Sequence, residues 1–237
     1  MQAERNAQII SIKWVRYISL THPTRSAIAL NPTYKIAVLE FNQQDVSDRS
    51  DKFYFNSMQY RRAKTSGATY FFTVVTYNRH RILCEPENVD LLRNAFQYVI
   101  RQHHFKIDAI VILPDHIHSL WTLPETDADF STRWRLIKSY FSRQCHSQYQ
   151  GEISTSRQHK GEKAIWQRRF WEHQVRDDRD FVNHVEYIHY NPVRHGLVTA
   201  PKDWQYSSFH RYVEEGTYDQ MWGASERLSF DSNIGME

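Results

Sequence analysis

Hydrophobic residues follow regular patterns only from about residue 68 onwards. Residues 1–57 mix short apolar pieces with polar and turn-forming stretches, which predicts a poorly structured N-terminal extension. Residues 68–77 (ATYFFTVVTY) are rich in aromatic and β-branched side chains and predict a buried strand. In residues 87–102, apolar side chains recur at helical spacing, so a helix is expected there.

A pair of strands and a second helix come next. Residues 105–113 (FKIDAIVIL) and 116–123 (HIHSLWTL) are separated by the turn-forming pair Pro114-Asp115, which predicts an antiparallel hairpin. A helix is expected from about Asp129, because large apolar side chains recur along one side of it. These side chains are Phe130, Trp134, Ile137 and Phe141.

The remaining elements complete the prediction of the fold. The polar residues 146–163 predict a flexible loop, and residues 168–175 (RRFWEHQV) predict a short strand. A third helix begins near Asp178 and is expected to end at about Asn191, because Pro192 disfavours helical geometry at the residue before it. This order predicts an α+β fold, a ferredoxin-like antiparallel sheet with helices packed on one face.

The length and composition are those of one domain with extensions. The chain has 237 residues, of which 41% are hydrophobic, and we assign residues 58–215 to the domain and residues 216–237 to a C-terminal tail. No run approaches the roughly 20 apolar residues of a membrane span, so no membrane partner is expected. Cys84 and Cys145 lie far apart without a paired motif, which argues against a cysteine-based zinc site and fits a reducing cytoplasm.

Positive charge is concentrated in one stretch of the chain. The totals are 30 Lys+Arg against 27 Asp+Glu, a formal charge of +3 that does not by itself indicate a nucleic-acid binder. Residues 131–176, however, hold ten cations and three anions. Such a stretch is typical of a phosphate-binding surface, although charge on a helix is also common on a merely solvated face.

His116 and His118 flank Ile117 on a predicted strand, so both imidazoles are expected on the same face. Two nitrogen ligands on one rigid strand are half of a metal site. Among thirteen histidines, a single His-x-His pair is also typical of surface or hydrogen-bonded core histidines, so further ligands are needed to decide.

The third helix offers such a partner. At 100° per residue, Asp180, Asn183, His184 and Asn191 fall within about 60° of Tyr187, so this tyrosine lies on a polar stripe. A tyrosine at the rim of the core remains the alternative interpretation. Tyr190 competes for the same role, but we prefer Tyr187, because its spacing of four residues from Asn191 gives both side chains a common face.

These residue types suit attack on a phosphodiester. A tyrosine hydroxyl, with a pKa near ~10, becomes an effective nucleophile when a cation polarises the phosphate. Two histidines and the Asn191 oxygen would hold that cation. Their mixed nitrogen and oxygen atoms favour Mg²⁺ or Mn²⁺, with zinc or nickel as competitors in vitro.

Four segments together resemble the REP-associated tyrosine transposases, bacterial single-tyrosine transposases of the HUH endonuclease superfamily. They are YFFTVVTYNRHRIL, LPDHIHSLWTLPETDADFSTRWRLIKSYFSR, IWQRRFWEHQVRDDRDFVNHVEYIHYNPVRHGLV and DWQYSSFHRY. The resemblance covers about residues 60–212 and departs from the family in the 57 preceding residues and in the loop at 146–163.

The resemblance implies both the site and the reaction. It assigns the metal to His116, His118 and Asn191 and the nucleophile to Tyr187. It implies cleavage of single-stranded DNA through a 5′-phosphotyrosine link, at repetitive palindromic hairpins, by a nucleoid-associated cytoplasmic protein. A monomer or a weak homodimer is expected.

Candidate DNA contacts come from the cations of the basic stretch and from a short arm before the first strand. Arg133, Arg135 and Lys138 lie on the helix that we expect to flank the metal site. The others are Arg168 and Arg169 and, in the arm, Arg61 and Arg62.

Two other functions remain open. A non-catalytic hairpin-binding protein would bind DNA without metal and form no covalent adduct. A metal-dependent phosphodiesterase that uses water would tolerate Tyr187→Phe. The joint presence of both histidines, the tyrosine and the asparagine favours the enzyme over both.

Overall fold

The computed structural model describes residues 64–225, 228–230 and 234–235. The predicted extension at residues 1–57 and the predicted basic arm, Arg61 and Arg62, lie outside these residues. The described strands and longer helices are β1 (Thr69–Val75), α2 (Pro86–Gln102), β2 (Lys106–Ile112), β3 (His116–Thr122), α3 (Phe130–Gln144), β4 (Trp171–Gln174), α5 (Asp178–Arg194) and α6 (Phe209–Glu214). The short helical segments are η1 (Tyr77–Arg79), η2 (Ser147–Tyr149), α4 (Thr155–Gln158) and η3 (Pro201–Asp203).

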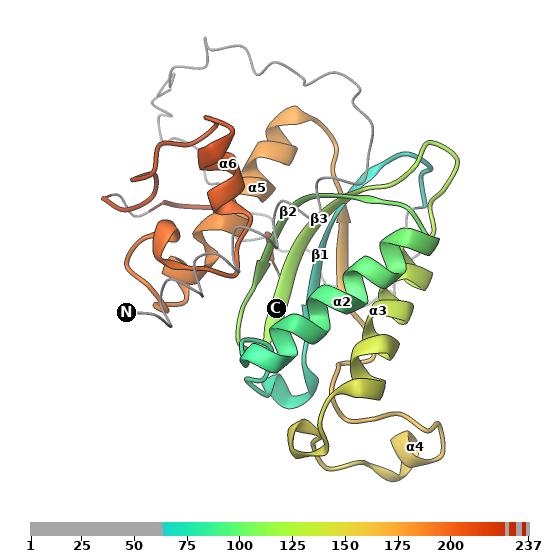
Figure 1. The fold of residues 1–237 in the computed structure, drawn as a ribbon. Coiled ribbons are helices and arrows are strands. Elements are labelled where there is room, and N and C mark those ends of the chain that lie inside the picture. Colours follow the sequence, from blue (N-terminus) through green and yellow to red (C-terminus); the bar gives the residue numbers. More distant parts are fainter. Residues whose placement is uncertain (1–63, 226–227, 231–233, 236–237) are drawn as a thin grey trace, which may run out of the picture. The chain divides into compact units, whose positions relative to one another are not determined.

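The four strands form one antiparallel sheet in the order β2-β3-β1-β4 (Figure 1). β2 and β3 make the predicted hairpin around Pro114-Asp115, and Leu113 donates its backbone N–H to the His116 carbonyl at 2.9 Å. A helix follows β1 and another follows β3, which is the ferredoxin-like connection of strands. The predicted α+β class and antiparallel sheet are confirmed.

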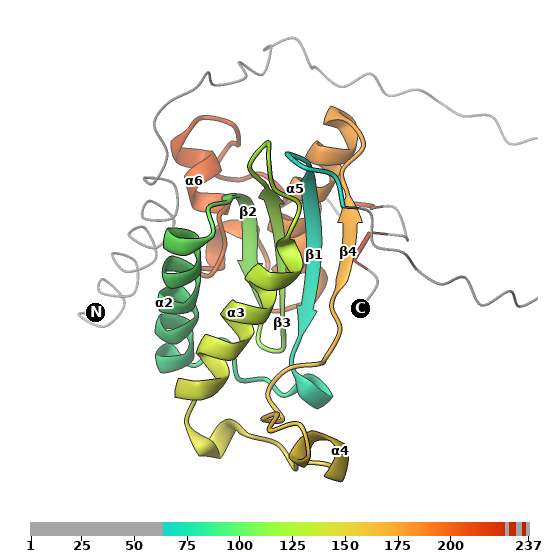
Figure 2. The same cartoon turned by 90° about the vertical axis from the view of Figure 1, so that its right-hand side faces the viewer.

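Each face of the sheet has its own core, because side chains alternate along a strand. On one face, Phe72 and Trp121 pack against Trp134 of α3, and α2 lies beside α3 (Figure 2). On the opposite face, Phe71 contacts Tyr187 of α5. α2 and α3 therefore cover one face as expected, whereas α5 covers the other.

The third helix is longer than predicted. The expected end at about Asn191 is wrong, because α5 continues through Pro192 to Arg194. Pro192 removes one backbone donor from α5, and the helix continues for only two residues beyond it. The carbonyls of Asn191 and Pro192 accept hydrogen bonds from the N–H groups of His195 and Leu197.

The segment predicted as a flexible loop, residues 146–163, contains η2 and α4. Arg157 of α4 is buried, with its guanidinium 4.2 Å from the centre of the Tyr77 ring. It also donates a hydrogen bond to the Trp166 carbonyl at 3.3 Å. These contacts attach the segment to the end of β1.

No helix in the described part of the chain combines the length and apolar character needed to cross a bilayer.

Candidate active site

β3 carries two histidines on the sheet face that α5 covers. His116 and His118 are both buried, and their ring centroids are 4.8 Å apart. Ile117, between them, belongs to the core on the opposite face. The two imidazoles therefore share a face, as the alternation along the strand predicts.

Neighbouring side chains hold the Nδ1 atom of each ring. His116 Nδ1 lies 2.7 Å from Asp115 Oδ1, and Asp115 Oδ2 accepts a hydrogen bond from Arg79 Nη1 at 3.1 Å. Thr73 pairs with His118 across β1 and β3 and places its Oγ1 3.0 Å from His118 Nδ1. Such bonds orient an imidazole and direct Nε2 towards a metal ion. Burial acts to raise the pKa of Asp115, but its contacts with His116 and Arg79 outweigh burial and lower it.

α5 brings Tyr187 and Asn191 to the same place. The Tyr187 ring centroid lies 5.2 Å from that of His118, and both α5 side chains are fully buried. Within the described part of the chain, neither Oδ1 nor Nδ2 of Asn191 has a hydrogen-bond partner. An unsatisfied buried polar group costs about 1–3 kcal/mol, so this amide is better explained as a ligand than as packing. Two oriented imidazoles and an amide oxygen fit a divalent cation.

The polar stripe on α5 is buried rather than solvated. Asp180 and His184 are also buried, and they precede Tyr187 and Asn191 at spacings of three and four residues along the helix. Phe71 of β1 packs against this stripe, with its ring centroid 4.8 Å from that of His184 and 6.0 Å from that of Tyr187. The stripe therefore faces the sheet along most of α5.

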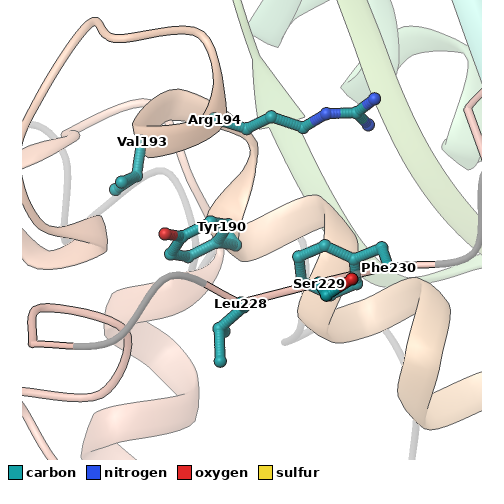
Figure 3. Close-up of a pocket in the computed structure, with 6 residues that line it drawn as sticks. All are labelled: Tyr190, Val193, Arg194, Leu228, Ser229 and Phe230. Carbon is teal, nitrogen blue, oxygen red and sulfur yellow. The ribbon is translucent and has the colours of Figure 1, made fainter.

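Tyr190 faces the C-terminal segment instead of the histidines. Its ring centroid is 5.7 Å from that of Phe230 and 6.4 Å from that of Trp222. It lines a cavity of about 610 Å³ at the end of α5 (Figure 3). The other lining residues are Val193, Arg194, Leu228, Ser229 and Phe230. This placement favours Tyr187 over Tyr190 as the nucleophile.

The C-terminal segment also covers Tyr187. The Phe230 ring centroid lies 5.6 Å from that of Tyr187, and a Cβ atom at Gly235 would collide with the Tyr187 hydroxyl. From α5 itself, the Arg194 guanidinium lies 5.1 Å from the centre of the Tyr187 ring. Tyr187 is therefore enclosed by β3, β1 and the segment that follows α6.

The cations of α3 do not lie beside the two histidines. The prediction that this helix flanks the metal site is wrong, because α3 packs on the other face of the sheet. Arg133 is buried, and its Nη2 donates to the His104 carbonyl and to Asp127 Oδ2, each at 2.7 Å. Its guanidinium anchors α3 and is not placed to contact DNA.

The other predicted contacts lie nearer the surface. Arg135, Arg168 and Arg169 are exposed. Arg168 donates to Glu162 at 2.8 Å, and Lys138 donates to the Gln167 carbonyl. These four cations belong to α3 and to the segment that leads into β4.

Several residues at the site were not predicted from the sequence. They are Asp115, Arg79 and Thr73, which hold the histidines, and His195, whose ring centroid is 5.1 Å from that of His116. Asp115 could have been found from its place next to the His-x-His pair. His195 lies four residues beyond Asn191, so helical spacing could have indicated it as well.

Comparison with known proteins identifies the relatives of this chain. Residues 64–191 match the family model described as "Transposase IS200 like". The chain is 44% identical over 164 residues to a REP-associated tyrosine transposase of Escherichia coli, covering 69% of this chain and 90% of that protein. A Haemophilus influenzae protein named for the same family is 43% identical over 175 residues, covering 74% of this chain and 98% of that protein.

A solved structure is similar as well. It is a REP-associated tyrosine transposase bound to a REP hairpin, with 42% identity and a TM-score of 0.59. The match covers 72% of this chain and 98% of that one. The similarity therefore extends over nearly the whole of the solved relative.

Proposed function

The chain belongs to the IS200-like transposases and, within them, to the REP-associated tyrosine transposases, and on this premise we propose that it cuts and rejoins single-stranded DNA beside palindromic hairpins. One observation carries the proposal. Tyr187 lies against His118, and Asn191, one turn further along α5, has a buried amide that no described residue satisfies.

The proposed reaction is a transesterification at phosphorus. The Tyr187 oxygen attacks the scissile phosphate, a phosphorus–oxygen bond to tyrosine forms, and the bond from phosphorus to the 3′-oxygen breaks. The tyrosine proton passes to solvent, and the departing 3′-oxygen takes up a proton to become a hydroxyl. In the reverse direction, a 3′-hydroxyl attacks the phosphotyrosine and rejoins a strand, so no external energy source is required.

His116, His118 and Asn191 would hold a divalent cation, Mg²⁺ or Mn²⁺. When bound, such an ion would neutralise charge on the non-bridging phosphate oxygens. Asp115 and Thr73 keep the two imidazoles oriented for that purpose. The two histidine nitrogens favour Mn²⁺ over Mg²⁺, because imidazole is a softer ligand than the oxygens that Mg²⁺ prefers.

The proposed DNA partner is a single strand that folds into a hairpin. The solved relative is bound to a REP hairpin, and we extend this partner to the present chain. Arg135, Lys138, Arg168 and Arg169 would contact phosphates, and Arg61 and Arg62 would form a basic arm. We propose a monomer or a weak homodimer as the acting form.

A hairpin-binding protein without turnover is the second candidate. It is favoured by the cover over Tyr187, because Phe230 and Gly235 lie where a DNA strand would have to reach the hydroxyl. This candidate predicts hairpin binding without metal and without an adduct. It differs from the first in chemistry and not in its DNA partner.

The test is an adduct assay on a denaturing gel. The full chain is incubated with a labelled single-stranded palindromic oligonucleotide and Mn²⁺, beside Tyr187→Phe and the matched control Tyr190→Phe. A metal-dependent protein–DNA band in the wild type and in Tyr190→Phe, absent from Tyr187→Phe, is the expected result. Cleavage by Tyr187→Phe would assign the attack to water or to Tyr190. Hairpin binding without cleavage would favour the second candidate.

A further inference from the structure

A second group of metal-ligand side chains lies on α5 before Tyr187. His173 of β4 places Nε2 2.8 Å from Asp180 Oδ2, and His184 places Nδ1 3.3 Å from Asp180 Oδ1. The two imidazole rings are stacked, with centroids 4.8 Å apart and planes 17° apart. One potential ligand atom from each of the three residues lies within 4.8 Å of the others. The three side chains therefore come together from two elements, β4 and α5.

Two of the three side chains in this group are buried. Asp180 is 6% exposed and His184 is 2% exposed, while His173 is partly accessible on the edge strand.

We propose that His173, Asp180 and His184 form a second site for a divalent transition-metal ion, of which Zn²⁺ is the preferred occupant. Two imidazoles and one carboxylate are a donor set that Zn²⁺, Co²⁺ and Ni²⁺ accept. Ligands about 2.0–2.2 Å from such an ion lie roughly 3–3.6 Å from one another, and the 2.8 Å between His173 Nε2 and Asp180 Oδ2 is slightly below that range. His184 Nδ1 also lies 2.7 Å from the Asp180 backbone oxygen, a contact typical of a histidine that binds metal through Nε2.

Arg176 occupies the position that the ion would take on the carboxylate. Its Nε and its backbone N–H each lie 3.0 Å from Asp180 Oδ2. The Arg176 side chain is 74% exposed, so its departure costs little. Arg176 and a metal ion would therefore compete for the Asp180 carboxylate, and removal of the arginine should strengthen metal binding.

The position of the site gives the ion a role. Its ligands join the edge strand β4 to the first turns of α5, the helix that carries Tyr187. The Phe71 ring contacts both His184 and Tyr187. An ion at this site would hold the nucleophile's helix against the sheet, on the side of Tyr187 opposite to Asn191.

The test counts bound ions in a protein that lacks the first site. The full chain with His116→Ala and His118→Ala is freed of metal, and Zn²⁺ binding is measured by calorimetry, with the absorption spectrum of Co²⁺ as a second readout. We expect one ion per chain. Adding His173→Gln should weaken binding by at least about 100-fold. Arg176→Gln should strengthen it by about two- to fivefold.

A matched control and a fold check complete the design. His104→Ala with His159→Ala, two exposed histidines, should leave the Zn²⁺ affinity of the same background unchanged. The helical circular-dichroism signal confirms that each variant is folded. Absence of Zn²⁺ binding in the His116→Ala/His118→Ala chain would overturn the proposal. A Zn²⁺ affinity that stays the same in both His173→Gln and Arg176→Gln would overturn the proposal as well.

Discussion

Replacement of Asp115 should weaken metal binding at the proposed site of His116, His118 and Asn191 without replacing any of these ligands. Asp115 Oδ1 lies 2.7 Å from His116 Nδ1, and Asp115 Oδ2 accepts a hydrogen bond from Arg79 Nη1 at 3.1 Å. In Asp115→Ala, the His116 ring loses the partner that fixes its orientation and supports the basicity of Nε2. In Asp115→Asn, the amide oxygen can still accept a hydrogen bond from the ring, but the negative charge is lost.

The size of the effect follows from this difference. Loss of a partner that orients a ligating histidine typically weakens metal affinity by about 10–100-fold, or about 1.4–2.7 kcal/mol. Because Asp115→Ala loses both charge and hydrogen bond, we expect a change near the upper figure, about 100-fold. Asp115→Asn keeps the geometry and should lie near the lower figure, about 10-fold. The pair of variants therefore separates the charge of Asp115 from its hydrogen bond.

The assay is the Mn²⁺ concentration that gives half-maximal adduct formation on the labelled hairpin oligonucleotide. Adduct formation would depend on the ion proposed at His116, His118 and Asn191, so an ion at the second proposed site would not enter the measurement directly. Asp90→Asn is the control, because Asp90 is an exposed carboxylate that pairs with Arg93 on α2. A half-maximal Mn²⁺ concentration that stays the same in Asp115→Ala would refute the reasoning.

Three further outcomes are expected. Asn191→Ala should abolish adduct formation. It should change the free energy of unfolding in urea by less than about 1 kcal/mol, because the amide has no partner among the described residues. A large loss of stability would mean that Asn191 has a structural role in packing. Gly235→Ala should raise the rate of adduct formation on the gel, because the added Cβ would collide with the Tyr187 hydroxyl and displace the covering segment. An unchanged rate would mean that this segment does not limit the access of DNA to the Tyr187 hydroxyl. Asp180→Asn should lower the free energy of unfolding most above about pH 4, and its difference from the wild type should shrink as the pH falls further. The reason is that a carboxylate with a lowered folded-state pKa loses its stabilising effect as it becomes protonated. A constant difference in this free energy between pH 7 and pH 3, measured by urea titration, would contradict this.

Local periodicity was sufficient to predict much of the candidate site. Alternation along β3 placed His116 and His118 on one face, because the side-chain period of a strand depends on backbone geometry alone. The helical period likewise placed Tyr187 and Asn191 on one stripe of α5. The error at Pro192 arose because a proline restricts its neighbour without always ending a helix.

Charge patterns were a poorer guide than periodicity. Arg133 belongs to the basic stretch by sequence, but the fold buries it against Asp127 and the carbonyl of His104. Lys138 and Arg168 are likewise engaged by neighbouring groups. A sequence counts charges without showing which of them acquire partners within the protein, because those partners lie on other elements.

The sequence by itself determined the four strands and the three longer helices, apart from the exact end of α5. It also determined their amphipathic faces and the residue types of the proposed chemistry, since each depends on neighbours a few positions apart. Only the tertiary structure decided that α5 covers the face of β3 that carries the histidines, and that His173 meets Asp180 and His184. It also decided that the C-terminal segment lies over Tyr187. These contacts join residues far apart in the chain, and they depend on strand order and helix packing, which many weak interactions determine together.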